Sequence, residues 1–186
     1  MVDVVEEIRK FVEEESKKPT AKYGYEPYEF HLIPMRNYAV KLAKGLGADV
    51  EIVEISAWSH DVGSIIYGRE KHHLTGVKII GKKLSELNYP KNKIKQVLHC
   101  ILTHRSSNGL KPKTIEAKII SDADAISNFD NISGIFKAAF VYEGQTQGEA
   151  RKTSRDKLSR KWNKLYLDES KKLIKPKYDA AMLLLS

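Results

Sequence analysis

The stretch SAWSHDVGSIIYGREKHHLTG, from Ser56 to Gly76, contains three of the chain's six histidines within 14 residues. His60 is followed directly by Asp61, and His72 and His73 stand together just before a Thr-Gly pair. Histidine and carboxylate side chains both bind divalent metals, although either can also be a hydrogen-bonded structural group. The stretch therefore poses a choice between a metal site and an ordinary run of polar residues.

The residues before this histidine-aspartate pair indicate a buried helix. Asp49 can cap its start, and Val50, Val53, Ala57 and Trp58 recur at the helical period. The pair thus falls at the inward-facing end of an apolar helix. Polar groups in such a place need a hydrogen-bond partner or a metal ion, because leaving them unpaired is costly.

Helical periodicity extends over nearly the whole chain, with glycine and proline at the breaks. A glycine-punctuated loop is predicted over residues 62–71, and no strand pattern is convincing. The sequence therefore predicts an all-α fold, a single helical bundle over residues 1–186. The predicted helices begin near Val4 and then cover about 32–44, 49–61, 72–87, 91–104, 113–129, 132–142, 149–167 and 169–185.

Composition restricts the class of protein further. Of the 186 residues, 41% are hydrophobic and 30% charged, which is typical of a soluble globular domain. The single Cys100 excludes an internal disulfide and favours a reducing compartment. The N-terminus lacks the pattern of a signal peptide, and the longest apolar run, Ala180 to Leu185, is too short to span a membrane. We expect a cytoplasmic protein without a membrane partner.

The net charge of +8 is concentrated near the C-terminus. Residues Glu149 to Lys177 contain eleven Lys or Arg against four Asp or Glu. Such a segment can attract nucleic acid or phosphorylated substrates. Because its basic residues are interleaved with Leu158, Trp162 and Leu165 at near-helical spacing, we interpret it mainly as a solvated helix face.

Other polar residues repeat the pattern of the histidine-aspartate pair. His31 precedes the apolar helix of Met35, Ala39 and Leu42; His72 opens a helix, His104 closes one, and Asp124 follows Ile120 by one turn. Each is unremarkable alone. Together they are typical of ligands that converge from several helices onto one site.

The order His31, His60-Asp61, Asp124 resembles the H…HD…D pattern of the HD-domain phosphohydrolase superfamily. Four segments extend the resemblance: HDVGS, HHLTGVKII, ILTHRS and IISDADAIS, over about residues 29–131. The resemblance implies an all-α HD-domain bundle with additional C-terminal helices at 132–186, and metal-dependent phosphate hydrolysis.

Carried over by position, the resemblance implies a set of six metal ligands. Asp61 would bridge two ions, and His72 and His104 would complete the second site, so these three are also the predicted catalytic residues. Nitrogen and oxygen ligands of this kind favour one or two divalent ions among Mn, Fe, Co, Ni and Zn. The implied ligands are His31, His60, Asp61, His72, His104 and Asp124.

At two places in the sequence, more than one residue could be the metal ligand. Asp122 and Asp124 are about 200° apart on a helix and cannot face the same way; the resemblance favours Asp124, and Asp122 is predicted to form a surface pair with Lys118. His99 lies about 140° around its helix from His104, so it is interpreted as a packed or exposed histidine.

The implied reaction is hydrolysis of a phosphate ester or anhydride, of a nucleotide in the leading hypothesis, by a metal-activated water. A small anionic substrate needs cationic contacts. Lys71 and His73 flank His72, Arg105 follows His104, and Arg36 lies five residues after His31, near the start of its helix. The alternative for each of them is a plain surface position.

Two other functions stay open from the sequence. One is a basic helical protein that binds nucleic acid, although no recognition motif supports it and nucleic acid is the less favoured partner. The other is a folded but inactive HD-domain protein, against which the complete ligand set argues. A homodimer is possible in either case.

Overall fold

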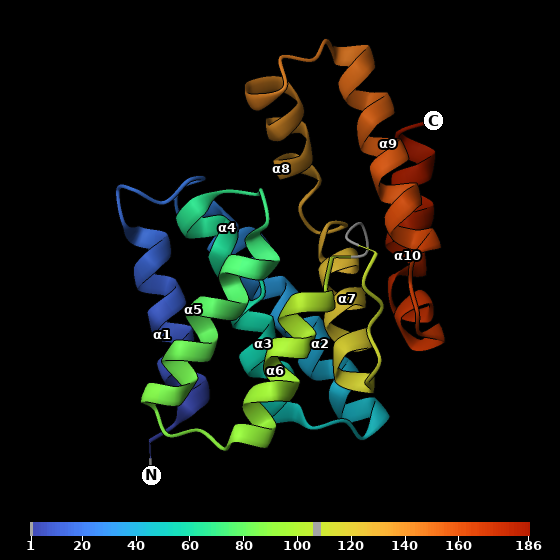
Figure 1. Ribbon diagram of the computed structural model, residues 1–186. Coiled ribbons are helices and arrows are strands. Elements are labelled where there is room, and N and C mark those ends of the chain that lie inside the picture. Colours follow the sequence, from blue (N-terminus) through green and yellow to red (C-terminus); the bar gives the residue numbers. More distant parts are fainter. Residues whose placement is uncertain (1, 106–108) are drawn as a thin grey trace.

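The computed structural model describes residues 2–105 and 109–186. Within them every regular element is a helix (Figure 1), which confirms the predicted all-α class. Part of the predicted loop RSSNGLKP, residues 106–108, lies outside the described residues. The elements are α1 (Val4–Lys17), π-helix η1 (Tyr28–Leu32), α2 (Ile33–Leu46), α3 (Val50–Ser59), α4 (Val62–Tyr67), α5 (His72–Glu86), α6 (Lys91–Thr103), α7 (Ile115–Ser127), α8 (Ile132–Lys137), π-helix η3 (Ala138–Tyr142), α9 (Gln147–Asn163) and α10 (Asp168–Leu184).

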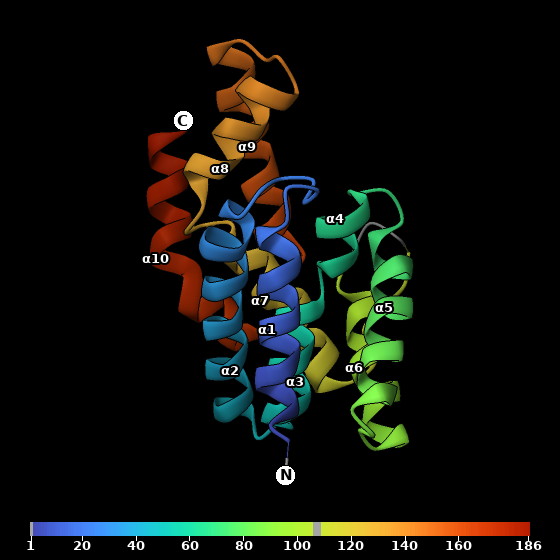
Figure 2. The same ribbon diagram turned by 90° about the vertical axis from the view of Figure 1, so that its left-hand side faces the viewer.

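Helix α3 lies at the centre of the bundle and packs against α1, α2, α6 and α7, which surround it in Figures 1 and 2. The Asp49 side chain caps its start by accepting a hydrogen bond from the Ile52 backbone N–H. Most of its residues are buried, among them Ile52, Val53, Ile55, Ala57 and Trp58. Because α3 is enclosed by its neighbours, its last turn delivers His60 directly into the interior.

The loop predicted over residues 62–71 is partly wrong, because α4 occupies Val62–Tyr67. The Asp61 carbonyl accepts hydrogen bonds from the backbone N–H groups of Ser64 and Ile65, so a new helix begins directly after the histidine-aspartate pair. Glycine in this stretch predicts a helix break. Here Gly63 is instead a position where two helices touch.

The C-terminal helices α9 and α10 pack on α7. Asp122, on α7, is 1% exposed and accepts hydrogen bonds from the backbone N–H groups of Tyr166 and Leu167, both at 2.9 Å. The predicted surface pair of Asp122 with Lys118 is therefore wrong. Its carboxylate instead satisfies two backbone donors at the start of α10 and attaches the C-terminal helices to the bundle.

Helix α8 and η3 extend above the end of α7 before the chain turns into α9 (Figure 1). This segment contacts the chain before η1 at two points. Lys137 forms an ion pair with Glu26 at 2.6 Å, and the rings of Tyr142 and Tyr23 meet edge to face at 6.2 Å. Among the described helices, none has the length and apolar character needed to cross a bilayer.

Candidate metal centre

The structure brings the six predicted metal ligands together from six separate positions in the bundle. Most of them lie at helix ends, where a side chain can point past its own helix toward its neighbours. His31 lies in η1, His60 directly after α3, Asp61 directly before α4, His72 at the first position of α5, His104 directly after α6 and Asp124 in the last turn of α7.

Two of these positions depend on a close contact between α4 and α5. A Cβ atom on Gly63 would lie 2.3 Å from the carbonyl oxygen of His72, 2.4 Å from Oγ1 of Thr75 and 2.8 Å from the backbone N of Gly76. Only a residue without a side chain allows the two helix starts to approach this closely. The contact places His72 next to Asp61.

The histidine rings are all oriented in the same way. Nδ1 of His60, His72 and His104 lies 2.9, 2.8 and 2.6 Å from a backbone carbonyl oxygen of Ala57, Arg69 and Ile101 respectively. A carbonyl only accepts hydrogen bonds, so Nδ1 carries the proton in each ring. Nε2 of each ring, the atom that can bind a metal, is therefore directed into the site.

His31 reaches the same state through a hydroxyl group. Ser127 donates its hydroxyl hydrogen to the Asp124 carbonyl at 3.0 Å, and its Oγ lies 3.1 Å from Nδ1 of His31. The hydroxyl oxygen thus accepts from Nδ1, and Nε2 of His31 is again left as an acceptor.

The ligand atoms fall into two groups: His31, His60 and Asp124 form the first, and Asp61, His72 and His104 form the second. In the first group, Nε2 of His31 lies 3.3 Å from Nε2 of His60 and 3.5 Å from Oδ1 of Asp124. In the second, Nε2 of His72 lies 3.1 Å from Nε2 of His104. Asp61 stands between them: Oδ2 is 3.6 Å from His60 Nε2, and Oδ1 is 3.2 Å from His72 Nε2.

This donor set fits a pair of divalent ions. In each group two imidazole lone pairs face one another, an arrangement that repels unless a cation or a proton lies between them. Ligand atoms each about 2.1 Å from one ion would be about 3.0–3.4 Å apart, close to the separations observed. Asp61 supplies one oxygen to each group, as a bridging carboxylate does.

The protonation of the site is set by burial and by its own charges. Burial lowers the pKa of His31 and His104 to about 4, despite the nearby carboxylates, so both rings are neutral at pH 7. Burial opposes ionisation of Asp61, yet the surrounding imidazoles hold its pKa well below the ordinary value. Burial acts against the charged form of His72 too, but Asp61 raises its pKa overall. The site therefore attracts positive charge.

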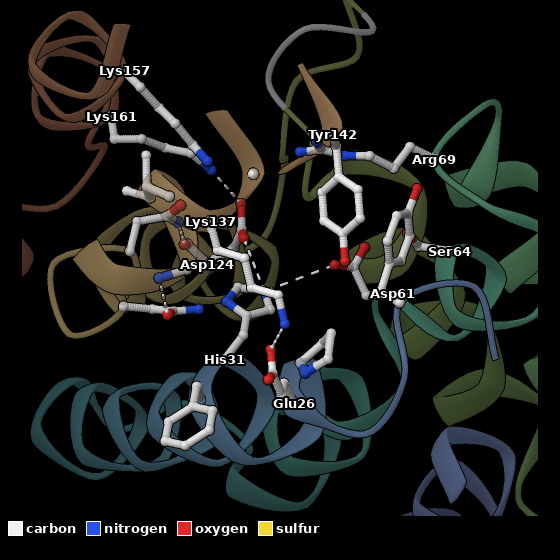
Figure 3. Close-up of a pocket in the computed structure, with 18 of the residues that line it drawn as sticks. Glu26, His31, Asp61, Ser64, Arg69, Asp124, Lys137, Tyr142, Lys157 and Lys161 are labelled. Atoms are coloured by element: carbon white, nitrogen blue, oxygen red, sulfur yellow. Dashed lines mark hydrogen bonds and ion pairs between the residues drawn. The ribbon is translucent and has the colours of Figure 1, made fainter. Parts of the chain in front are cut away.

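A lysine from the C-terminal helices reaches the same centre. Nζ of Lys161, on α9, forms an ion pair with Oδ2 of Asp124 at 2.8 Å, while Oδ1 of that carboxylate faces His31 (Figure 3). Lys157, one turn earlier on α9, lies beside it. The interpretation of the basic segment as a solvated face is thus incomplete, because these two lysines enter the site.

A pocket of about 610 Å³ opens over the ligands, within the size range of small-molecule sites. One wall is cationic and includes Arg69, Arg105, Lys157 and Lys161. The other is formed by Tyr23, Pro27, Phe30, Ile135, Ala138 and Tyr142, from the chain around η1 and from α8 and η3. Figure 3 shows Tyr142 and Arg69 above the ligands.

Of the four predicted substrate contacts, the structure places only Arg105 in this pocket. Arg36 forms an ion pair with Glu54 and does not line the pocket. Lys71 is exposed in a left-handed conformation before α5, and His73 is half-buried behind His72; neither lines the pocket. His73 directly follows His72 but points elsewhere, because neighbouring helical side chains point about 100° apart.

The sequence reasoning missed several pocket residues. Lys157 and Lys161 are separated by four positions, so they share a helix face, but no local signal tells which face meets α7. Tyr23, Tyr142 and Arg69 lie in segments without a motif. His99 lies apart from both ligand groups, and its Nε2 accepts a hydrogen bond from the Lys113 backbone N–H.

Solved structures with similar folds cover almost the whole chain. YpgQ of Bacillus subtilis, in complex with ADP, is 21% identical with a TM-score of 0.74, over 97% of this chain and 89% of that one. An HD-superfamily hydrolase of Bacillus thuringiensis is 20% identical with a TM-score of 0.74, over 97% and 91%. Lin1889 of Listeria innocua is 16% identical with a TM-score of 0.75, over 98% and 92%. At these identities the likeness establishes the fold alone.

Comparisons of the sequence match about half of the chain. Two curated relatives are ribonucleases Y, from Thermoanaerobacter pseudethanolicus at 31% identity and Alkaliphilus metalliredigens at 34%, each over 98 residues. The matches span 52% of this chain but only 18% and 19% of those proteins. The HD domain family model matches residues 28–128, more than half of the chain. The chain therefore belongs to the HD-domain phosphohydrolase superfamily, as the order of its motifs predicts.

Proposed function

We propose that the protein is a metal-dependent phosphohydrolase that acts on a nucleotide. The observation that carries the proposal is the pair of ligand groups that share Asp61. Four imidazoles with their Nε2 lone pairs directed inward, together with two carboxylates, are the donors that bind Mn, Fe, Co, Ni or Zn. Two such groups joined by one carboxylate are characteristic of hydrolytic sites for phosphate.

The bound metals would supply a water of lowered pKa and Lewis-acid stabilisation of the phosphoryl oxygens. The protein side chains then have separate tasks. His31, His60 and Asp124 would bind the first ion, and His72 and His104 would bind the second. The hydrogen bonds at Nδ1 keep each histidine ring in place.

The cationic wall would orient the phosphate and stabilise its charge. The Arg105 guanidinium lies 3.4 Å from the Arg69 carbonyl oxygen, and both side chains line the pocket beside His104. A guanidinium can hold two phosphoryl oxygens at once, and stabilisation of developing charge is a large part of catalysis at such sites. Arg105 is our candidate for the residue that contacts the reacting phosphate.

The aromatic wall of the pocket supports a nucleotide rather than a simple phosphate. Tyr23, Phe30 and Tyr142 provide aromatic faces, and Asn128 and Asn131 add amide groups that can donate and accept hydrogen bonds. A nucleobase needs this combination of stacking surface and polar contacts. The binding of ADP by YpgQ, which shares this fold, also supports the proposal.

A second candidate function is cleavage of an RNA phosphodiester bond. It is favoured by the 98-residue matches to two ribonucleases Y, which are the most similar in sequence of the relatives described above. The same ligand groups could hold a phosphodiester, so the metal centre does not separate the two candidates. A substrate panel does.

The first experiment is elemental analysis of protein purified without chelator, paired with a panel of nucleoside monophosphates, nucleoside triphosphates and a single-stranded oligoribonucleotide. We expect one or two transition-metal ions per chain and hydrolysis of nucleotides. Much less than one ion per chain, with no binding or stabilisation by added Mn²⁺, Co²⁺ or Ni²⁺, would overturn the proposal. Cleavage of the oligoribonucleotide alone would establish the second candidate.

A pair of variants tests the ligand assignment. Asp61→Ala removes the shared carboxylate, so we expect the metal content to fall and hydrolysis to drop to background, with the helical content retained. His99→Ala is the control: it lies outside both groups, so rates should stay within about threefold of wild type. Equal losses in the two variants would contradict the assignment.

A further inference from the structure

A second cavity, of about 360 Å³, leads from the metal centre along α9. It shares Arg69, His104, Arg105, Asp124, Lys157 and Lys161 with the main pocket, so the two spaces meet at the ligands. Beyond them it is lined by Arg160 and Lys164. We call this space the α9 groove.

The groove is lined by one face of α9. Thr153, Lys157, Arg160, Lys161 and Lys164 are spaced by three or four positions and therefore share a side of the helix. Tyr23, Phe30 and Tyr142 line the main pocket but not this groove. A ligand held at the metal centre could thus extend in two directions.

Positive charge in the groove exceeds the negative charge available to balance it. Six side chains are cationic: Arg69, Arg105, Lys157, Arg160, Lys161 and Lys164. The lining carboxylates are Asp124 and Glu143. Among residues 2–105 and 109–186, no carboxylate is within ion-pair distance of Lys157, Arg160 or Lys164; Lys161 alone of the α9 cations here is paired, with Asp124.

The pKa of Lys157 is affected by this concentration of positive charge. Burial, together with the like charges of Lys161 and Arg69, lowers the pKa of Lys157 to about 8. Holding a lysine among other cations costs free energy, because each charge opposes the others. An anion in the groove would remove that cost, which is a reason for such an arrangement to exist.

We propose that the α9 groove binds a chain of linked phosphates that continues from the phosphate held at the metal centre. The substrate class is then a nucleoside di- or triphosphate, with its base on the aromatic wall and its phosphate chain against Arg160 and Lys164. This inference rests on the proposed function, since it deepens the description of the same site.

The lining of the groove favours a phosphate chain over a polynucleotide. Single-stranded nucleic acid is held by aromatic side chains that stack on successive bases, with cations along the backbone. His104 is the one aromatic ring that lines the groove among the described residues, and it is a metal ligand. A chain with charge on every unit and no bases matches a wall of arginines and lysines.

The kinetic test compares two double variants of full-length protein. Arg160→Ala with Lys164→Ala removes two groove cations. Lys152→Ala with Arg155→Ala removes the same charge from exposed positions of α9 that line neither cavity. For each, kcat/KM is measured on a nucleoside triphosphate and on the matching monophosphate. We expect the triphosphate-to-monophosphate ratio to fall at least about tenfold in the groove variant and by less than about twofold in the control.

A binding test does not depend on activity. Inorganic tripolyphosphate and inorganic phosphate are titrated calorimetrically into each protein, with metal content determined before and after to exclude extraction of metal. We expect the groove variant to weaken tripolyphosphate binding at least about tenfold and phosphate binding much less. If no nucleotide is hydrolysed but this pattern appears, the proposed function fails and the groove stands.

Three results would overturn the inference. The first is equal loss of tripolyphosphate binding in the groove and control variants, which would mean a general effect of charge. The second is an unchanged triphosphate-to-monophosphate ratio in the groove variant. The third is a single-stranded oligoribonucleotide that displaces tripolyphosphate and depends more strongly on Arg160 and Lys164, which would assign the groove to RNA.

Discussion

Replacing Gly63 by alanine should damage the metal centre through the backbone rather than through a ligand. The added Cβ would lie 2.3 Å from the His72 carbonyl oxygen, against an ordinary contact of 3.4 Å or more, so α4 and α5 must separate by about 1 Å. Asp61 and His72 lie on the two sides of this contact, with Oδ1 of Asp61 3.2 Å from Nε2 of His72. We therefore expect the second ligand group to lose its geometry.

Two opposing effects set the change in stability. Overpacking of a close contact costs about 1–3 kcal/mol. Alanine in a helix gains up to about 1 kcal/mol over glycine. Because the nearest clashing atoms include a backbone carbonyl and a backbone nitrogen, which cannot rotate away, the cost should exceed the gain. We expect a net loss of about 1–2 kcal/mol, which lowers Tm by about 2–8 °C in a chain of this size.

The assay combines thermal unfolding with metal analysis, and Gly45→Ala is the matched control. Gly45 lies in α2, where among the described residues no heavy atom outside its own neighbourhood comes within 4 Å of an added Cβ. That variant should keep its metal and unfold at or above the wild-type temperature. A Gly63→Ala protein with wild-type Tm and full metal content would refute the claim that the α4–α5 contact positions His72.

Three further predictions concern single residues. Arg105→Ala should retain metal and lower kcat/KM by about 10- to 100-fold, because a guanidinium holds phosphate by two hydrogen bonds, and Arg105→Lys should recover part of the loss. Steady-state kinetics with the metal content quantified tests this, and an unchanged kcat/KM in the alanine variant would contradict it. Asp122→Ala should lower the free energy of unfolding by about 2 kcal/mol, because it leaves the backbone N–H groups of Tyr166 and Leu167 without an acceptor. Urea-induced unfolding measures this change, and an unaltered midpoint of that transition would contradict the role of Asp122. Burial raises the pKa of Cys100 to about 12, so its thiol should stay inert to Ellman's reagent at pH 8 until the chain unfolds; rapid labelling of native protein would disprove its burial.

The structure brings the six candidate ligands together, and four of them are tied to a local sequence pattern. His60 and Asp61 end an apolar helix, His72 begins one and His104 ends another, so helical periodicity alone places them at termini. Termini of packed helices are where polar side chains can meet without being buried along a helix face. Packing of the helices brings these separate positions into one site. Periodicity does not predict that packing, whereas the resemblance of the motifs to the HD-domain pattern implies it.

Other residues in and around the site are harder to predict because their positions depend on contacts between distant segments. Asp122 accepts hydrogen bonds from backbone groups 44 and 45 positions later in the chain, and a local sequence pattern cannot predict contacts over that separation. Lys161 meets Asp124 across 37 positions. Arg36 lies five positions after His31, about 140° around a helix, and it pairs with Glu54 outside the pocket.

The charges of the site explain why cations from α9 belong beside a metal centre. The carboxylates Asp61 and Asp124 supply two negative charges, and burial keeps His31 and His104 neutral at pH 7. Two divalent ions would exceed this by two positive charges, and the paired Lys161 adds another. A phosphate monoester, with two charges at most, would leave the site and the neighbouring groove cations incompletely neutralised. A di- or triphosphate carries three or four charges. The charge of the ligand set and the α9 cations taken together thus favours the same substrate class as the lining of the α9 groove.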